Sequence, residues 1–402
     1  MFKTFIQKRP GFISVMALVT AVFIFIIGIG LLTLGFGRRL YSVRSNNQVA
    51  ARCAADYGLT KAVYKMNEWL QGPSSDPLPA ESGVTISGSE VDDCNVTYSY
   101  TVTNDGGTYK VQAWGTSGPI TKTVLCDLRL KGLFEYAILT KNILDIGSCS
   151  YVTCADCCSL PLRIGTTNNP TSQIILKPNS VVEGDILLGQ NGTESLIVGS
   201  GATYGNVYAV ATDFDLPEPS LPTNPDYETY AINHGTLNLT NSSGNVTTGD
   251  YIYNKIDLKT GGTLNIVGPG NVTLWIKSGI ELGNNADIKI DPNASLTIYL
   301  SGPLDGLNGS GFNNTGGEPR QLSIIGMSAY PMTIKNSGAF CGTIYAPHAD
   351  VHMYNDSEVY GSIIANNYKQ DDSAIFTYDA KLRTVSIEDQ YARFVPIHWR
   401  EL

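Results

Sequence analysis

Charged residues and histidines are scarce in this chain of 402 residues. Asp, Glu, Lys and Arg make up 16% of it, against about 25% in a typical soluble domain. The net charge is −9, and no basic region is present that could neutralise phosphates, which argues against a nucleic-acid partner. Only four histidines are present, so the chain has little capacity for acid–base chemistry near neutral pH. It also contains no G-x-S-x-G element and no phosphate-binding glycine loop, and we expect no cofactor.

Glycine and tyrosine are abundant, with 41 and 22 copies, and Asn and Thr are frequent. Hydrophobic residues make up 43% of the chain, which is enough to form a core. The length leaves room for two or three domains. This composition predicts a mainly β protein.

One long apolar run lies near the N-terminus. Residues 12–37 carry no charged side chain over 26 positions. As a helix they would extend about 39 Å, more than the ~30 Å hydrocarbon core of a bilayer. The run is longer than a secretory signal, and no A-x-A-like cleavage site follows it. We therefore expect a single membrane-spanning helix.

The residues before this run are few and basic, and they end in Pro10-Gly11 directly before Phe12. This arrangement resembles the class III leader of type IV pilins and type II secretion pseudopilins. The resemblance implies that a prepilin peptidase cuts between Gly11 and Phe12 on the cytoplasmic side of the membrane. Met16 stands where most pilins carry Glu, which favours a minor or initiating subunit over a major pilin.

The helix is expected to continue to about Leu70, before Gln71-Gly72-Pro73 ends it. Residues 54–59, Ala-Ala-Asp-Tyr-Gly-Leu, resemble the A-E-A-G-L pattern of PilX-type minor pilins. Apolar residues of this half are compatible with one helical stripe, namely Val49, Cys53, Ala54, Tyr57, Val63, Tyr64 and Met66.

A short strand-rich stretch follows the helix. Residues 95–102 and 109–114 predict a hairpin around an Asp-Gly-Gly turn, and residues 121–130 predict a further strand. We expect a small antiparallel sheet against the upper half of the helix. Cys94 and Cys126 lie near the ends of these strands and could form a disulfide, although eight cysteines leave many pairings open.

Beyond residue 136, short strands rich in Ile, Val, Leu, Thr and Tyr alternate with Gly, Asn, Asp and Pro turns. A glycine-centred element recurs at Gly184 and Gly205 and again at Gly342 and Gly361, about 20 residues apart in each pair. This period predicts a right-handed β-solenoid, with a β-sandwich as the alternative. The sequences IYAPHADV and YGSIIA in this part resemble elements of the β-helical domain of PilX-type surface proteins.

The densest cysteine cluster is Cys149-x4-Cys154-x2-Cys157-Cys158. Its first three cysteines have the spacing that opens a plant-type two-iron cluster. Disulfides that clamp a loop are favoured instead, because a domain carried across the membrane reaches an oxidising space. Free thiols are the remaining alternative.

Two histidines and an aspartate form a second candidate site. As a strand, His348, Asp350 and His352 would lie on one face, where two imidazoles and a carboxylate can hold zinc. An exposed polar row is the favoured interpretation, so these residues are weak metal candidates and no metal is assigned.

Acidic clusters matter because some β-helical proteins cleave polysaccharides. Asp213, Asp215 and Glu218 form the best local cluster, but the prolines around them favour a loop. We expect a structural protein and not an enzyme. The alternatives are a membrane-anchored β-helical enzyme acting on surface polysaccharide, and an anchored scaffold never cut at Gly11.

The sequence as a whole predicts a minor pilin or pseudopilin-like surface protein. We expect it to assemble through its helix with other pilins, to span the inner (cytoplasmic) membrane once and to carry its large domain outside the cytoplasm, on a pilus or the cell surface. The outer face of that domain could bind carbohydrate or protein. The expected segments are a leader (1–11), a transmembrane and filament helix (12–72), a strand-rich neck (73–133), a β-solenoid (134–380) and a C-terminal tail (381–402).

Overall fold

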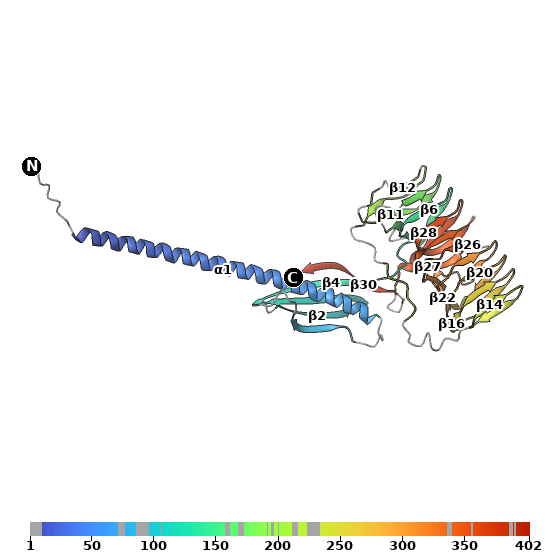
Figure 1. Cartoon of the computed structure of the whole chain (residues 1–402), viewed down its shortest axis with the longest axis horizontal. Helices are drawn as coiled ribbons and strands as arrows, with labels where there is room; N and C mark the ends of the chain where they lie inside the picture. Colours follow the sequence, from blue (N-terminus) through green and yellow to red (C-terminus); the bar gives the residue numbers. More distant parts are fainter. Residues whose placement is uncertain are drawn as a thin grey trace, which may run out of the picture. The chain divides into compact units, whose positions relative to one another are not determined.

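The computed structural model describes most of the chain, and two compact units are present. Lys131–Ala392 form one unit, and Met1–Leu130 with Arg393–Leu402 form the other (Figure 1). The described residues are 10–70, 77–85, 96–105, 107–156, 161–167, 173–190, 192–193, 197–199, 201–210, 216–222, 234–335, 340–354, 357–385, 389 and 391–402, without the side chains of 10–14, 85 and 198.

The first unit contains one long helix and one small sheet. Helix α1 (Pro10–Trp69) has 60 residues and is therefore about 90 Å long. Its second half packs on the sheet, mainly on β2 and β3. The antiparallel hairpin and the third strand predicted from the sequence are confirmed. The sheet has the strand order β1 (Ala80–Thr85), β2 (Val96–Asp105), β3 (Thr108–Ser117), β4 (Ile120–Lys131) and β30 (Arg393–Glu401).

Small residues form the face of α1 that packs on the sheet. A Cβ atom at Gly115 of β3 would overlap the backbone of Ala51 and Ala55, and Gly58 lies against Tyr98. The predicted stripe is wrong for four of its members, because Val49, Cys53, Tyr57 and Tyr64 are exposed, whereas Ala54 and Met66 are buried. The close approach of helix and sheet leaves room only for short side chains over most of the contact. The buried residues are Ala51, Ala54, Ala55, Gly58, Leu59, Ala62 and Met66.

The last residues of the chain belong to this sheet. We predicted 381–402 as a tail, but Arg393–Glu401 form strand β30 beside β4. Glu401 is held by Lys122 at 2.7 Å and by Arg52 at 3.1 Å. These ion pairs join the end of the chain to β4 and to α1. Local sequence patterns do not predict contacts between residues so far apart in the chain.

The second unit is a parallel β-solenoid, which confirms the predicted fold class. Its strands stack in register in three rows, and β27 and β28 are long enough to belong to more than one row. The first row contains β16 (Gly249–Tyr253), β19 (Gly270–Ile276), β22 (Ala294–Leu300), β25 (Leu322–Gly326), β27 (Phe340–Met353), β28 (Glu358–Gln370), β5 (Ile138–Thr140), β8 (Leu162–Thr166), β11 (Gly184–Leu188) and β13 (Val207–Ala209).

The second row contains β14 (Thr236–Leu239), β17 (Lys255–Leu258), β20 (Ile280–Leu282), β23 (Leu304–Gly306), β26 (Met332–Ile334), β27, β28, β6 (Ile143–Ile146), β9 (Gln173–Leu176) and β12 (Ile197–Val198). The third row contains β15 (Ser243–Val246), β18 (Thr263–Ile266), β21 (Asp287–Ile290) and β24 (Gly311–Asn314), and, beyond β28, β29 (Ile375–Asp379), β7 (Tyr151–Ala155) and β10 (Val181–Val182). Two 3-10 turns, Pro319–Gln321 and Ala380–Arg383, complete the described elements.

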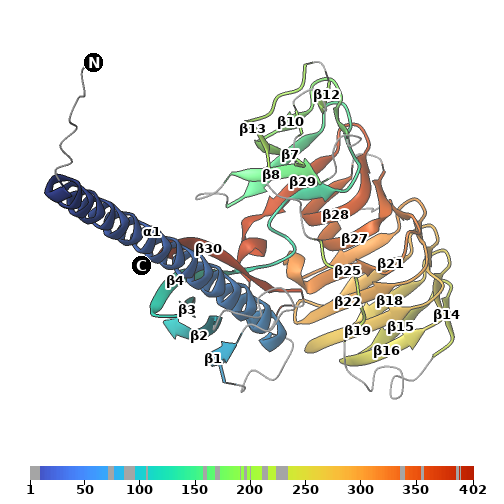
Figure 2. The ribbon, with the colours of Figure 1, turned by 60° about the vertical axis from the view of Figure 1, so that its left-hand side comes forward.

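The coils of the solenoid do not stack in the order of the sequence. Strand β5 pairs with β28, so the first coil of the chain lies on the last one. From β5 the coils continue through β8 and β11 to one end of the solenoid. The chain then resumes at the opposite end with β14 and returns through β27 and β28 to the middle (Figure 2). The sequence predicts a repeat but not this order.

A ladder of isoleucines crosses the junction without a break. Ile344, Ile363, Ile138 and Ile164 occupy the same position in four consecutive strands, and all are fully buried. Burying one such side chain contributes about 1.5–3 kcal/mol. The apolar interior is therefore continuous where β5 stacks on β28.

The half-buried Tyr360 predicts loss of solenoid stability in alkali. Burial, helped by Asp379, raises the pKa of Tyr360 to about 12, while the unfolded chain keeps a pKa near 10. Above pH 10 the unfolded state releases this proton first, so the stability that the neutral phenol provides is present below pH 10 and lost between pH 10 and 12. Urea unfolding measured at steps of pH should show this decline.

In Tyr360→Phe, the slope of the unfolding free energy against pH between pH 10 and 12 should lose the contribution of one proton. In Tyr330→Phe, whose ring is exposed, the slope should be unchanged. An identical pH dependence in Tyr360→Phe and the unaltered chain would contradict the assignment.

Candidate functional site

The first half of α1 is apolar and contacts no other part of the described chain. The side chains of 15–37 are almost all exposed, and this stretch is long and apolar enough to cross a membrane. Its hydroxyl groups are satisfied within the helix, because Thr20 and Thr33 each donate a hydrogen bond of 2.7 Å to the carbonyl one turn earlier. A helix whose polar groups bond internally suits a bilayer or the packed helices of a filament.

The predicted cleavage pair lies at the start of this helix. Gly11 and Phe12 belong to the first turn of α1, which begins at Pro10. Met16 is exposed one turn later. Arg38, Arg39 and Arg44 follow the apolar half and are exposed.

The predicted disulfides are wrong for two cysteines. Cys126 is a free thiol buried in the sheet, where its sulfur lies 3.4 Å from the Ile397 carbonyl and burial raises its pKa. Cys149 is a free thiol on an exposed turn with a φ of 56°. Cys154 is disulfide-bonded. Cys94, Cys157 and Cys158 lie outside the described residues.

The histidines and the aspartate of β27 are not brought together. His348 pairs with Glu218 at 2.6 Å, and His352 pairs with Asp371 at 2.9 Å. Asp350 accepts hydrogen bonds from two asparagines of β28, Asn366 and Asn367. Within the described part of the chain, no group of three His, Cys, Asp or Glu side chains could hold a metal ion.

The acidic cluster falls partly outside the described residues, because Asp213 and Asp215 are not included. Glu218 lies in the segment 216–222, which crosses the outer face of the solenoid. The hydrogen bond from His348 lowers the pKa of Glu218. Pro217 accepts a hydrogen bond from Tyr345, and the Ser220 backbone exchanges two hydrogen bonds of 2.9 Å with the Tyr391 hydroxyl.

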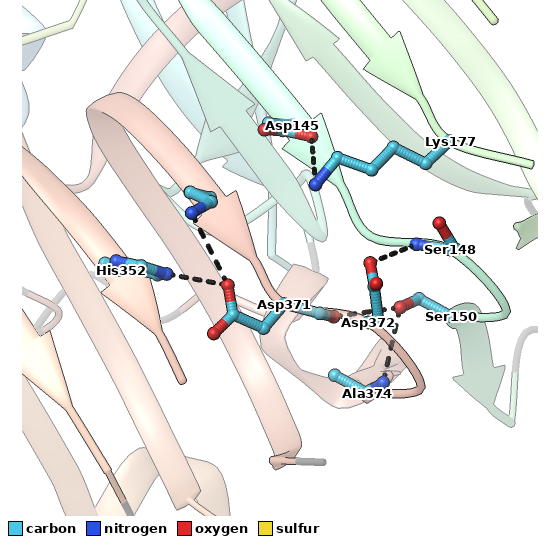
Figure 3. A network of polar contacts seen from close by, with 9 residues as sticks. Asp145, Ser148, Ser150, Lys177, His352, Asp371, Asp372 and Ala374 are labelled. Carbon is cyan, nitrogen blue, oxygen red and sulfur yellow. Dashed lines mark hydrogen bonds and ion pairs between the residues drawn. The ribbon is translucent and has the colours of Figure 1, made fainter. Parts of the chain in front are cut away.

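A polar network that the sequence does not reveal joins the first coil to the last. The backbone N–H of Ser148 donates to Asp372 at 2.7 Å, and the Ser150 hydroxyl donates to the Asp371 carbonyl at 3.1 Å (Figure 3). The Asp371 carboxylate contacts His352 and, at 3.5 Å, Lys369. The network joins residues more than 220 positions apart, so spacing in the sequence gives no signal for it.

The outer face of the first row carries a row of hydroxyl side chains. Thr273, Thr297, Ser323, Thr343 and Ser362 occupy one position in five consecutive strands, and we call them the hydroxyl row. A second, apolar row lies two residues further along each strand. It contains Trp275, Tyr299, Ile325, Tyr345 and Ile364.

A cleft of about 400 Å3 lies over the middle of the hydroxyl row. Thr297, Ser323 and Thr343 contribute to its lining, together with Phe134 and Tyr391. Its charged lining residues, among those described, are Arg320 and Asp389, which are 3.8 Å apart. Neither His348 nor His352 lines it.

The geometry defines a protein with a largely exposed apolar helix, a small antiparallel sheet and a parallel β-solenoid. A family model described as a domain of unknown function (DUF7305) matches residues 224–385. No curated protein sequence matches the chain.

Solved structures similar to the chain include the competence-associated pilin ComZ from Thermus thermophilus, at 12% identity and a TM-score of 0.36 over 89% of this chain and 97% of that one. The DUF3494 domain of an ice-binding protein from Shewanella frigidimarina has 15% identity and a TM-score of 0.27, over 61% and 94%. An ice-binding protein from an Antarctic bacterium of the Flavobacteriaceae has 12% identity and a TM-score of 0.23, over 61% and 66%.

Proposed function

We propose that this chain is a minor pilin or pseudopilin-like surface protein that carries a β-solenoid as its surface-binding domain. The observation that supports the proposal is the apolar half of α1, which contacts nothing in the described chain and has its hydroxyl groups satisfied internally. Such a helix needs an apolar environment, because exposed apolar surface is unfavourable in water. A bilayer supplies this environment before assembly, and the helices of other pilins supply it afterwards.

The second half of α1 supports the same proposal. It is fixed to the antiparallel sheet through Ala54, Ala55, Gly58 and Leu59, which belong to the segment that resembles the minor-pilin pattern. The helix thereby connects a membrane or filament segment to a folded head. In this proposal the protein spans the inner membrane once, and its solenoid lies outside the cytoplasm.

Processing by a prepilin peptidase tests the proposal. The full chain is co-expressed with the peptidase, and the mature N-terminus is determined by mass spectrometry. We expect an N-terminus at Phe12 in most of the protein, and an uncut chain in Gly11→Ala, because a Cβ at the cleaved bond obstructs the peptidase.

Gly28→Ala is the matched control for this experiment. Gly28 lies within the apolar half of α1 and has no neighbour within 4 Å, so its replacement should leave cleavage unchanged. An intact N-terminus in the unaltered chain, with the peptidase active on a known substrate, would overturn the proposal.

A further inference from the structure

We propose that the hydroxyl row binds a neutral glycan chain, whose end enters the cleft beside Tyr391. The role of such binding rests on the proposed function, which places the solenoid outside the cytoplasm. The binding itself does not depend on cleavage or assembly. Four observations on the described residues support the proposal.

The first observation is that part of the hydroxyl row has no hydrogen-bond partners among the described residues. Thr273, Thr297 and Ser323 are half-buried, and none of their hydroxyls makes a hydrogen bond with another described residue. Further along the row the hydroxyls are used within the protein, because Thr343 donates to the Leu322 carbonyl at 3.2 Å and Ser362 to the Tyr136 carbonyl at 2.6 Å. Among the described residues, the row thus has an unsatisfied part and a part whose hydroxyls are already bonded.

The second observation is the regular spacing of these groups. Neighbouring strands of a sheet lie about 4.8 Å apart, and one sugar ring of a linear glycan advances by a similar length. Each hydroxyl can both donate and accept a hydrogen bond. A glycan hydroxyl has the same two capacities, so successive sugars can meet successive strands.

The third observation is the apolar row beside the hydroxyl row, in which Trp275 is half-buried and the other members are buried. Trp275 is half-buried beside Thr273, and Leu216 and Leu221 of the crossing segment pack on the same apolar cluster. Tyr345 and Tyr391 have their ring centroids 5.7 Å apart. Trp275 and Tyr391 are half-buried, and the exposed parts of such rings suit the C–H faces of a sugar.

The fourth observation is the balance of charge. Arg320 and Asp389, the ionisable acid and base of the described cleft lining, lie close together and cancel. An anionic glycan or a phosphate would meet no net positive charge there. A cleft of this volume lies within the range of small-molecule sites and accommodates the terminal sugars of a chain.

Binding by the full chain in detergent micelles tests the proposal. The probes are neutral oligosaccharides of one to six rings, with acidic and sulfated oligosaccharides and extended peptides as comparators, all on one array. The neutral probe that is best retained is then titrated by calorimetry. We expect affinity to rise with chain length up to about four rings, because each added ring reaches another strand.

The variant that removes the unsatisfied hydroxyls is Thr297→Val combined with Ser323→Ala. It should weaken binding about tenfold, since two hydrogen bonds to the ligand are lost. Thr263→Val is the matched control, because Thr263 is also a half-buried, unpartnered threonine of a solenoid strand but lies in a different row. Urea unfolding shows whether the variants keep their fold, and the single Ser323→Ala change serves if the double variant does not.

Three outcomes would overturn the proposal: no neutral oligosaccharide retained, preference for peptides or acidic glycans, or equal weakening in Thr263→Val. The uncut Gly11→Ala chain should bind as well as the unaltered chain. This keeps the two proposals separate, because failure of cleavage would leave binding intact and failure of binding would leave cleavage intact.

Discussion

Gly115→Val is expected to detach α1 from the sheet of the first unit. A Cβ at this position would overlap the carbonyl oxygen of Ala51 and the amide of Ala55, and would lie 2.8 Å from the Cβ of Ala54. These atoms belong to a helix backbone and cannot move singly, so the whole helix must shift. We expect the unit to lose about 3 kcal/mol or more of its stability.

Limited trypsin digestion with mass spectrometry measures this effect. Cleavage after Lys61 and Lys65, which lie on the half of α1 that covers the sheet, should become markedly faster in Gly115→Val. Gly107→Ala is the control, because Gly107 lies in the hairpin turn of the same sheet with no neighbour within 4 Å and a φ of 93°, so it should cost only about 1 kcal/mol. Equal cleavage rates in Gly115→Val and the unaltered chain would show that the helix does not lie this close to β3.

The second large effect is expected at Gly361, in the strand that joins the two halves of the solenoid. Its φ is 150°, and a Cβ there would overlap the carbonyl oxygen of Gly342 in the neighbouring strand. Gly361→Val should therefore separate β28 from β27, and the strands that depend on β28 should open with it. A loss of about 3–4 kcal/mol is expected, enough to unfold a marginal domain.

Hydrogen–deuterium exchange with mass spectrometry locates this change. Peptides from β28 and β5 should lose protection in Gly361→Val, whereas peptides from the antiparallel sheet of the first unit should keep it. Gly317→Ala provides the comparison, since Gly317 has a φ of 71° and no neighbour within 4 Å, and should cost about 1 kcal/mol. Full protection of β5 in Gly361→Val would contradict its dependence on β28.

The strands of the solenoid could be predicted from the sequence because each carries its own signal. Alternating residues such as those of 263–267 and 296–300 correspond to β18 and β22 to within two residues. The recurring glycines were informative for the same reason. Gly342 and Gly361 pair directly in neighbouring strands, so the repeat in the sequence is a repeat in space.

The order of the coils could not be predicted, because isoleucine, leucine and valine recur at interior positions in most coils. Ile363 stacks on Ile138 as well as it would stack on the isoleucine of any other coil. Strand β30 was missed for a related reason, since its pairing with β4 depends on contacts such as Lys122–Glu401 across most of the chain. The hydroxyl row could not be predicted either. Its side chains become neighbours only through the register between five separate strands, which the sequence alone does not reveal.

The stacking of the first coil on the last one has a consequence for how the protein is made. A ribosome releases β5 long before β28, so the edge of β5 has no partner while most of the solenoid is still being synthesised. Contacts between residues this far apart slow folding, because a long loop must close before they form. The exposed edge of β5 therefore stays unpaired during synthesis, and it pairs only when the carboxy-terminal coil with β28 has been made. Chaperone protection of the emerging chain would matter most over this interval.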